Sequence, residues 1–407
     1  MCFCINQTKF ARLFVVITVL ISLAGCVAVS EVHNSQQSKI RVATFNVSME
    51  ATNYESARKI QSANNLALIN ALATGKHTQI KNIAEIIQRT RPDIILLNEF
   101  DYIPDAKAGI DVFKSKYLEV SQLGFAPIFF PYVYIAPVNT GVKTPFQDKN
   151  SRLTHYGFGK YPGQYGMVLL SKYPIEFDQV RTFQSFLWQD MPNHLMPKDE
   201  AGNAWYNEKE SALMRLSSKS HWDLPINVCN QPLHILASHP TPPVFDGKED
   251  RNGKRNHDEI RFWKDYIKGQ KASYHYDDRG QTGGIVADRP FVILGDLNAS
   301  PDEGDAHPNA IKQLLVHPRI NNQVVPKSMG GAENKPESMY GKTHTASWGI
   351  RADYVLPSSE LVVEGSGVFW PAANDEASRL VSSRTASSDH RLVWADITLP
   401  VGSGTCQ

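Results

Sequence analysis

The sequence predicts an α/β protein that folds as one large domain. Short apolar runs rich in Val, Ile and Leu alternate with stretches of helical periodicity along the 407 residues. No internal repeat and no clear linker divides the chain, although long irregular insertions separate some of the elements. Six of the apolar runs begin or end at a carboxylate, an amide or an imidazole, so we expect one site where these strands converge.

The first 25 residues are typical of an export signal. Lys9 and Arg12 precede an apolar stretch over residues 13–23, which is short for a membrane span. The four residues Leu-Ala-Gly-Cys that end at Cys26 resemble a bacterial lipobox. The resemblance implies cleavage before Cys26 and lipid attachment to its sulfur. An ordinary signal peptide or an uncleaved anchor is the alternative.

Processing at Cys26 would make the membrane a partner of the protein through a lipid anchor. We then expect a cell-envelope lipoprotein, at the outer membrane or the cell surface. The remaining chain divides into a polar tether at residues 26–39, the domain at residues 40–400 and a tail at residues 401–407. Export permits Cys229 and Cys406 to pair, and the sequence leaves open whether they do.

Net charge bears on one class of partner. The chain holds 42 Lys and Arg against 41 Asp and Glu, a formal net charge of +1. Proteins that bind duplex DNA through many phosphates usually carry a clear basic excess. The net charge therefore does not support nucleic acid as a partner, although a local basic patch stays open.

The first half of the domain shows one strong helical pattern. Apolar residues at Ile80, Ile83, Ala84 and Ile87 predict an amphipathic helix over residues 78–91, which Pro92 stops. Strands are expected at residues 41–45, 94–97, 165–171 and 211–220. Loop insertions are expected at residues 102–165 and 184–210.

The second half continues the alternation of strands and helices. Strands are expected at residues 233–237, 291–294, 353–356 and 391–397. The first of them leads into His239-Pro-Thr-Pro-Pro, a rigid exit. Asn256 is expected to cap a helix over residues 257–267.

The strand ends carry six motifs with the chemistry of phosphate-ester hydrolysis. They are Asn46 in Thr-Phe-Asn, Glu99 in Leu-Leu-Asn-Glu, His239 in Ala-Ser-His, Asp296 and Asn298 in Gly-Asp-Leu-Asn, Asp353 in Ala-Asp-Tyr-Val, and Asp389 with His390 in Ser-Asp-His. Carboxylate and amide oxygens bind hard cations, and imidazoles stabilise charge or move protons. No cysteine stands in these motifs, which disfavours a thiolate zinc site. No P-loop or G-x-S-x-G motif indicates an NTPase or a serine hydrolase.

In this order, the six motifs resemble those of the endonuclease/exonuclease/phosphatase superfamily over residues 39–399. The resemblance implies a deoxyribonuclease I-like fold, a four-layer sandwich in which helices flank two packed β-sheets. It places the site at one edge of the sandwich. It also implies hydrolysis of phosphate esters with Mg²⁺ or Mn²⁺.

The resemblance further implies which residues hold the metal ion. Glu99 would be its main ligand, with Asn46 and Asp389 close by. One firm protein ligand suits Mg²⁺, which keeps several waters. Asp296 and Asn298 would orient water and a phosphoryl oxygen.

Two histidines would contact the phosphate. His390 would lie against it, with Asp353 fixing the ring and favouring imidazolium. His239 would be the second imidazole. Members of the superfamily differ over whether an Asp or a His activates water, so the general base stays open here.

The charged stretch after His239 is a candidate specificity element. We hypothesise that Arg251, Arg255 or His257 contacts the phosphate or its leaving group. The alternative is a solvated charged loop whose acidic residues pair with these cations.

These observations favour an exported, divalent-metal-dependent phosphoesterase that acts on phosphodiesters or phosphomonoesters of small or scavenged molecules. An extracellular nuclease is the second enzyme hypothesis. A lipoprotein that binds a ligand without turnover is the third, and the intact set of motif residues speaks against it.

Overall fold

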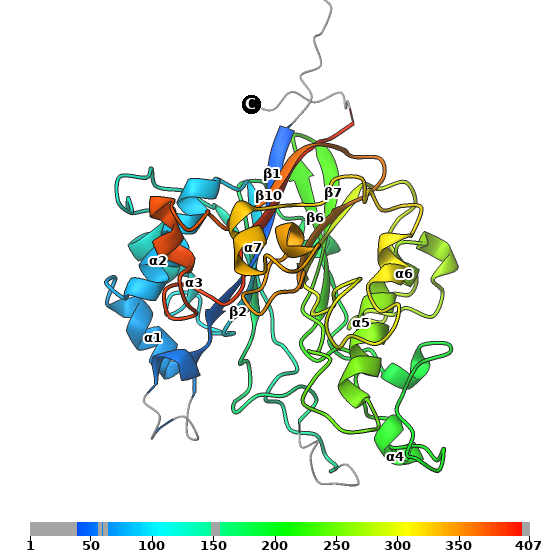
Figure 1. Ribbon diagram of the computed structural model, residues 1–407. Coiled ribbons are helices and arrows are strands. Elements are labelled where there is room, and N and C mark those ends of the chain that lie inside the picture. The colour runs from blue at the N-terminus through cyan, green and yellow to red at the C-terminus, as the bar shows by residue number, and fades with distance from the viewer. Residues whose placement is uncertain (1–38, 56–58, 60–63, 148–154, 401–407) are drawn as a thin grey trace, which may run out of the picture. The chain divides into compact units, whose positions relative to one another are not determined.

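Two β-sheets form the centre of the protein. The computed structural model describes residues 39–55, 59, 64–147 and 155–400, which belong to one compact unit (Figure 1). The first sheet has the order β10-β11-β1-β2-β4-β3. Its strands are β1 (Lys39–Met49), β2 (Ile94–Phe100), β3 (Tyr132–Ile135), β4 (Met167–Ser171), β10 (Val362–Val368) and β11 (Val393–Thr398). The second sheet has the order β5-β6-β7-β8-β9, with β5 (Arg181–Thr182), β6 (His221–Val228), β7 (Gln231–Ser238), β8 (Phe291–Asp296) and β9 (Asp353–Pro357).

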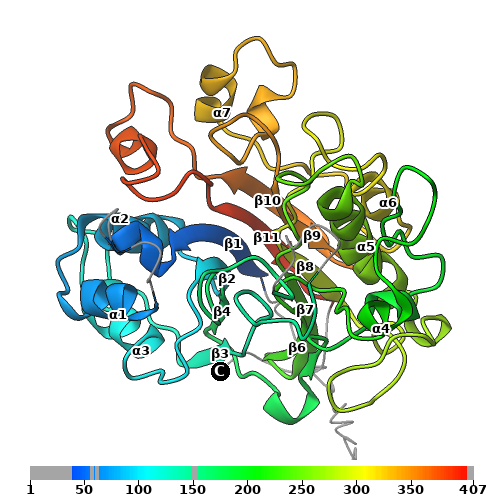
Figure 2. The same cartoon turned by 90° about the horizontal axis from the view of Figure 1, so that it is seen from below.

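Helices cover the outer face of each sheet. Figure 2 shows α1, α2 and α3 beside the first sheet and α4, α5 and α6 beside the second. The helices are α1 (Leu66–Ala73), α2 (Thr78–Thr90), α3 (Ile110–Phe113), α4 (Glu208–Ser211), α5 (Arg251–Tyr266), α6 (Lys312–Leu315) and α7 (Met329–Asn334). The expected four-layer α/β sandwich is therefore confirmed.

Alternating side chains of the second sheet build two separate cores. In β8, Val292 and Leu294 belong to the core between the sheets, which also holds residues of β1, β2 and α2. Phe291 and Ile293, one residue out of phase, pack in the second core with Ile260 and Trp263 of α5. A strand buried on both faces is apolar throughout, which explains why the sequence of β8 shows no polar alternation.

Two parallel pairs bring the motif strands together. β1 pairs with β2 so that Asn46 is opposite Asn98, and β7 pairs with β8. Parallel strands end at the same edge of their sheet. β1 and β2 also lie against β8 of the other sheet, so the ends of both pairs meet at the seam between the two sheets.

Most predicted elements are confirmed, although β3, β5 and β10 were not expected, and two boundary errors share a cause. The helix expected at residues 78–91 and most of the expected strands are present, whereas β3 lies in a region expected to be loop. The strand expected at residues 211–220 is wrong, since β6 begins only at His221. The helix expected to start after Asn256 begins six residues earlier, at Arg251.

Helix α5 explains both boundary errors. Arg255 donates to the carbonyls of Arg215 and Leu216, and Glu259 accepts from the backbone N–H of Ser218. The backbone before β6 is therefore satisfied by side chains of α5 rather than by a neighbouring strand. Polar residues that point inward hide the helical pattern, because periodicity arguments rely on apolar residues facing the core.

The predicted signal peptide, tether, lipid attachment at Cys26 and C-terminal tail lie outside the described residues, so they stay predictions. Cys229 is disulfide-bonded, and Cys406 also lies outside the described residues, so their pairing stays open. Among the described residues, no helix has the length and apolar character needed to span a bilayer.

Candidate active site

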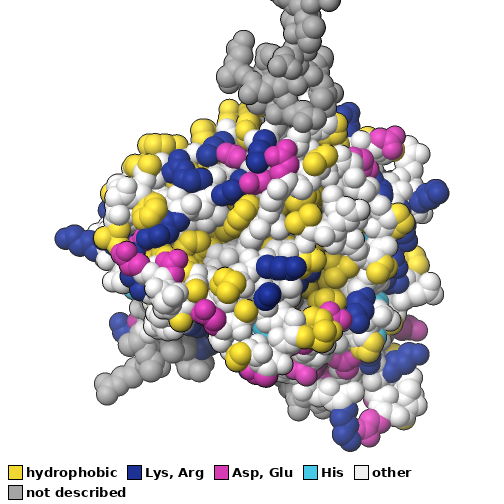
Figure 3. All heavy atoms as spheres, turned by 45° about the horizontal axis from the view of Figure 1, so that its top comes forward, with side chains coloured by type: hydrophobic (Ala, Val, Ile, Leu, Met, Phe, Trp, Pro, Cys, Tyr) yellow, Lys and Arg dark blue, Asp and Glu magenta, His cyan; other side chains and the backbone are white. Residues whose placement is uncertain are grey.

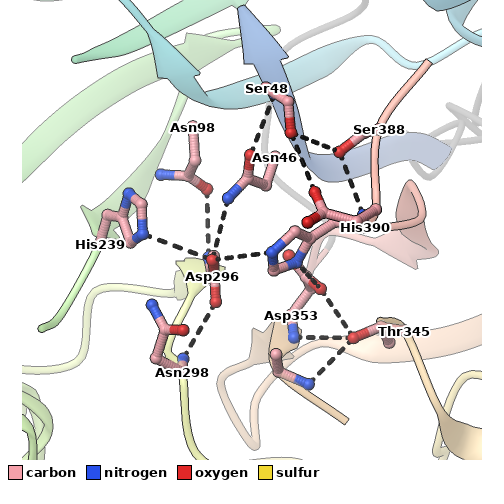
Figure 4. A network of polar contacts seen from close by, with 12 residues as sticks. Asn46, Ser48, Asn98, His239, Asp296, Asn298, Thr345, Asp353, Ser388 and His390 are labelled. Carbon is pink, nitrogen blue, oxygen red and sulfur yellow. Dashed lines mark hydrogen bonds and ion pairs between the residues drawn. The ribbon is translucent and has the colours of Figure 1, made fainter. Parts of the chain in front are cut away.

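Asp296, at the end of β8, is the centre of a buried polar network (Figure 4). Its Oδ2 lies 3.0 Å from Asn46 Nδ2, 3.4 Å from His239 Nε2 and 3.5 Å from His390 Nε2. Its Oδ1 accepts from the backbone N–H of Asn298 at 3.0 Å. Burial alone would raise the pKa of Asp296, but the two imidazoles and Asn46 hold it well below its usual range. Asp296 is therefore ionised at neutral pH.

The backbone before Asp296 requires glycine. Gly295 has φ +154°, and a Cβ placed on it would lie 2.0 Å from the carbonyl oxygen of Ser238 in β7. This close approach of β7 and β8 brings the start of the His239 loop beside Asp296. Asn256 of α5 holds together the loop after His239 and the loop after Asp296. Its Nδ2 donates to the carbonyls of Thr241 and Leu297, both at 2.9 Å.

His390 is held by a second carboxylate. Its Nδ1 lies 2.9 Å from Asp353 Oδ2 at the start of β9, while its Nε2 faces Asp296. Burial would lower the pKa of His390, but Asp353 and Asp296 raise it to about 10. The ring is thus an imidazolium at neutral pH. Trp348 covers it in a T-shaped contact, with the ring centroids 4.9 Å apart.

Thr345 fixes Asp353 in turn. Its hydroxyl donates to Asp353 Oδ2 at 2.7 Å and accepts from the backbone N–H groups of Ala352 and Asp353, each at 3.0 Å. Burial raises the pKa of Asp353 to about 6 against the opposing charge of His390. The order Thr345, Asp353, His390 is a hydrogen-bonded chain that ends at Asp296.

His239 has the opposite charge state from His390. Burial and the nearby charge of Lys219 lower its pKa to about 4, so the ring is neutral at pH 7. Among the described residues, none hydrogen-bonds its buried Nδ1. The site therefore combines a charged and a neutral imidazole on either side of one carboxylate, an arrangement that suits charge stabilisation on one side and proton transfer on the other.

Glu99 stands at the end of β2 in a left-handed backbone conformation, with φ +56°. Burial and the neighbouring Asp389 raise its pKa to about 7, while His390 and Arg384 oppose the rise. A divalent cation beside Glu99 would relieve this unfavourable concentration of negative charge.

Asp389 links the C-terminal motif to β1. Its Oδ1 accepts from the hydroxyl of Ser48 at 3.1 Å, and its Oδ2 pairs with Arg384 at 3.0 Å. Ser48 also hydrogen-bonds Ser388 at 3.0 Å. These contacts hold Asp389 next to Glu99 across the seam between the strands.

The network opens onto a cavity of about 490 Å³. Its polar part holds Glu99, Asp296, Asn298, Glu303, Asp305, Arg384, Asp389 and His390. Its apolar part holds Pro242, Pro243, Val244, Phe245, Ala306, Trp348 and Ile350. Five carboxylates therefore face one guanidinium and one imidazolium, so the cavity is acidic.

The donor set fits a divalent metal ion at Glu99 rather than within the His390 cluster. Asp296, Asp353 and His390 offer ligand atoms within 4.8 Å of one another. However, both nitrogens of His390 already face carboxylates, so these three residues form the hydrogen-bonded chain described above. Glu99 and Asp389 supply carboxylate oxygens at the cavity, as Mg²⁺ and Mn²⁺ prefer. Asn46 lies close to them, and its side chain opposes the rise in the pKa of Glu99.

The structure thus brings together the eight motif residues but not the three residues of the charged stretch. Arg255 is buried and bonded to backbone carbonyls, and Arg251 lies 3.7 Å from Glu249. His257 faces Asp258 at 3.0 Å. None of the three is in the cavity lining, so their contact with substrate stays a prediction that this geometry does not support.

Sequence reasoning missed the residues that support the motif residues from behind. Asn98 accepts from the backbone N–H of Asp296 at 3.1 Å, and Thr345 and Ser48 hold Asp353 and Asp389. Lys219 is buried beside His239 and donates to the carbonyl of Pro240 at 3.4 Å. Asn98 and Ser48 had a usable signal, since each stands within two residues of a motif residue on the same strand.

The sequence matches the family model "Endonuclease/Exonuclease/phosphatase family" over residues 43–390. The chain belongs to this family. Family members are hydrolases that act on phosphoesters and generally depend on a divalent metal. No curated protein matches the sequence.

Solved structures with a similar fold share little sequence with this family member. An endonuclease/exonuclease/phosphatase from Beutenbergia cavernae DSM 12333 is 17% identical, with a TM-score of 0.47, and covers 89% of this chain and 72% of its own. A family protein from Leptotrichia buccalis C-1013-b is 15% identical, with a TM-score of 0.44 and coverages of 88% and 99%. The human Nocturnin catalytic domain with bound sulfate is 14% identical, with a TM-score of 0.42 and coverages of 90% and 98%.

Proposed function

We propose that this protein is an exported, divalent-metal-dependent phosphoesterase that hydrolyses phosphodiester or phosphomonoester bonds of small substrates. The observation that carries the proposal is the ionised Asp296 between a charged His390 and a neutral His239, at the base of a cavity that also holds Glu99. This combination supplies a water-orienting carboxylate, a fixed positive charge and a metal ligand within one site.

The site residues then divide the work of the reaction. A divalent ion bound at Glu99 would polarise the phosphoryl group. Asp296 and Asn298 orient the attacking water and a phosphoryl oxygen. The imidazolium of His390, fixed by Asp353, stabilises the negative charge that develops on the phosphoryl oxygens. His239, being neutral, is able to accept or donate a proton at Nε2, and the assignment of the base to Asp296 or His239 stays open.

The lining of the cavity favours small substrates over nucleic acid. Its five carboxylates repel a polyanion, whereas its apolar part accepts an uncharged organic group of a phosphoester. Figure 3 shows acidic and basic side chains interspersed on the face drawn there. An extracellular nuclease is therefore the second hypothesis.

A phosphoester panel tests the function directly. Bis-p-nitrophenyl phosphate, p-nitrophenyl phosphate, inositol phosphates, phospholipids and plasmid DNA would be offered with Mg²⁺, Mn²⁺ or EDTA. We expect turnover of a small ester that EDTA and His239→Ala abolish, and that His194→Ala leaves intact because His194 is exposed outside the cavity. Degradation of DNA alone would favour the nuclease. Metal binding by folded protein without any turnover would favour the binding-protein hypothesis.

Export and lipid attachment rest on the sequence of residues 1–26. Cells that express the chain would be labelled with a radioactive fatty acid and then fractionated. We expect label in the wild-type protein in the membrane fraction and none in Cys26→Ser. Labelling that persists in Cys26→Ser would contradict the lipid anchor.

A further inference from the structure

A second cavity of about 430 Å³ adjoins the candidate active site. Ser300 lines both cavities, because the loop that leaves Asn298 runs from one to the other. The second cavity is lined on its polar side by Arg351, Lys327, Asn321, Tyr340 and Thr343. Nothing in the reaction described above uses it.

Arg351 is the unusual residue of this cavity. Only 8% of its surface is exposed. Its guanidinium lies over the ring of Tyr354, 4.4 Å from the ring centroid. Among the residues that the structure describes, none accepts a hydrogen bond from this guanidinium or forms an ion pair with it. Burial lowers the pKa of Arg351, and Tyr354 is the only group that opposes this.

The other buried arginines show what Arg351 lacks. Arg181 donates to Asp277 and to backbone carbonyls, Arg255 to two carbonyls, and Arg391 to three. Arginines with little exposed surface are normally paired in this way. No Arg351 nitrogen is among the fully buried unpartnered polar atoms of the described residues, so the guanidinium reaches the surface of the cavity, where none of these residues accepts a hydrogen bond from it.

The charges around Arg351 select an anion. Lys327 adds a second positive charge and is exposed. The single carboxylate of the lining, Asp302, lies 3.5 Å from Lys312 and is thereby partly neutralised. Ser300 and Tyr340 contribute hydroxyl groups. A guanidinium, an ammonium and hydroxyls together match the several oxygens of a phosphate better than the two oxygens of a carboxylate.

We propose that Arg351 and Lys327 bind a phosphate group in this second cavity. The group is either free inorganic phosphate or a phosphate carried by a molecule whose other end reaches the active site past Ser300. The proposed phosphate site is linked to the reaction site through the backbone. Arg351 stands two residues before Asp353, whose carboxylate holds His390. The binding site itself does not depend on the proposed function.

Calorimetric titration of the full chain with inorganic phosphate in EDTA tests the site. We expect the wild type and His239→Ala to bind phosphate alike at this site, since His239 lies beside Asp296 and is not in the lining of the second cavity. Arg351→Met should bind about ten- to a hundredfold more weakly, the effect of losing charge-assisted hydrogen bonds. Lys327→Met should bind about tenfold more weakly, whereas the control Lys335→Met, at a half-buried lysine outside both linings, should bind like the wild type.

Several results would overturn the proposal. Absence of phosphate binding by the wild type would do so, as would wild-type affinity in both Arg351→Met and Lys327→Met. Circular dichroism controls for the folding of each variant. If Arg351→Met does not fold, Lys327→Met alone decides, because its side chain is exposed and its loss does not disturb the core.

Kinetics distinguish the two sources of phosphate. Two diesters would be compared that both release p-nitrophenolate, one esterified with ethylene glycol and one with ethylene glycol phosphate. A phosphate carried by substrate predicts that Lys327→Met raises KM for the second diester alone. Free phosphate predicts equal effects on both diesters and a change in wild-type turnover when phosphate is added. A protein without phosphoesterase activity would hydrolyse neither diester but would still bind phosphate in the calorimetric titration. Failure of the proposed function is thus distinguished from failure of the phosphate site.

Discussion

Thr345→Val tests whether the hydrogen-bonded chain behind His390 controls the reaction. Valine has nearly the shape of threonine, but it removes the hydroxyl that donates to Asp353 at 2.7 Å and accepts from two backbone N–H groups at 3.0 Å. Loss of the bond to a carboxylate costs about 1.5–3 kcal/mol, and the unpaired N–H groups bring the loss of unfolding free energy to about 3–5 kcal/mol. If the lost bond is fully felt in the transition state, kcat falls about 10- to 100-fold.

The assay is hydrolysis of bis-p-nitrophenyl phosphate with Mn²⁺, well below the unfolding temperature, together with urea unfolding followed by tryptophan fluorescence. We expect kcat to fall while KM changes little, because Thr345 touches Asp353 and not the cavity. Thr345→Ser is the matched control: it keeps the hydroxyl, and we expect it to keep kcat within about threefold of wild type, since its main loss is one methyl group. Full kcat in Thr345→Val would refute the reasoning.

Three further predictions concern metal, pH and backbone. Glu99→Gln should weaken Mn²⁺ binding, measured by calorimetry, at least about tenfold. Glu303→Gln in the same cavity should not weaken it, because Glu303 already hydrogen-bonds His344 at 2.7 Å. Equal loss of Mn²⁺ affinity in both variants would contradict the assignment of Glu99 as the metal ligand. Burial lowers the pKa of His221 to about 4, so this buried ring is neutral in the fold and charged below about pH 6.5 in the unfolded chain. Stability is therefore full above pH 6.5 and falls as pH drops toward 4, by about 2 kcal/mol at pH 5 from this residue, and urea unfolding of His221→Phe should show a shallower fall. Gly295→Ala should lower the free energy of unfolding by about 2–4 kcal/mol, because its Cβ would lie 2.0 Å from the Ser238 carbonyl oxygen. Gly280→Ala, with φ +83° and open space around the new Cβ, should lower it by about 1 kcal/mol. Equal losses in the two variants would contradict the steric argument.

The motif residues could be predicted because each follows or opens an apolar strand that reads clearly in the sequence. Asp296 follows Val-Ile-Leu-Gly and Glu99 follows Ile-Ile-Leu-Leu-Asn, and these runs are β8 and β2 of the structure. Their meeting at one seam follows from the parallel pairing of β1 with β2 and of β7 with β8. Local pattern and global topology agree at these positions, which is typical of a foldable sequence.

The supporting residues could not be predicted by the same means. Thr345 lies in irregular chain eight residues before Asp353, and nothing in its local sequence indicates that its hydroxyl is buried against that carboxylate. Arg255 and Glu259 read as a solvated charged stretch, yet they are buried and hold the backbone that precedes β6. Such roles depend on contacts between distant segments, which periodicity does not report.

The direct hydrogen bonds between the two sheets have a consequence for unfolding. Asn46 of β1 donates to Asp296 of β8, and Asn98 of β2 accepts from the backbone N–H of Asp296. Neither half of the sandwich contains a reaction centre of its own. During denaturation, turnover should therefore be lost at the same denaturant concentration at which the two sheets separate. A ligand that contacts residues of both sheets binds only while the sheets are packed together, so it raises the melting temperature of the entire domain.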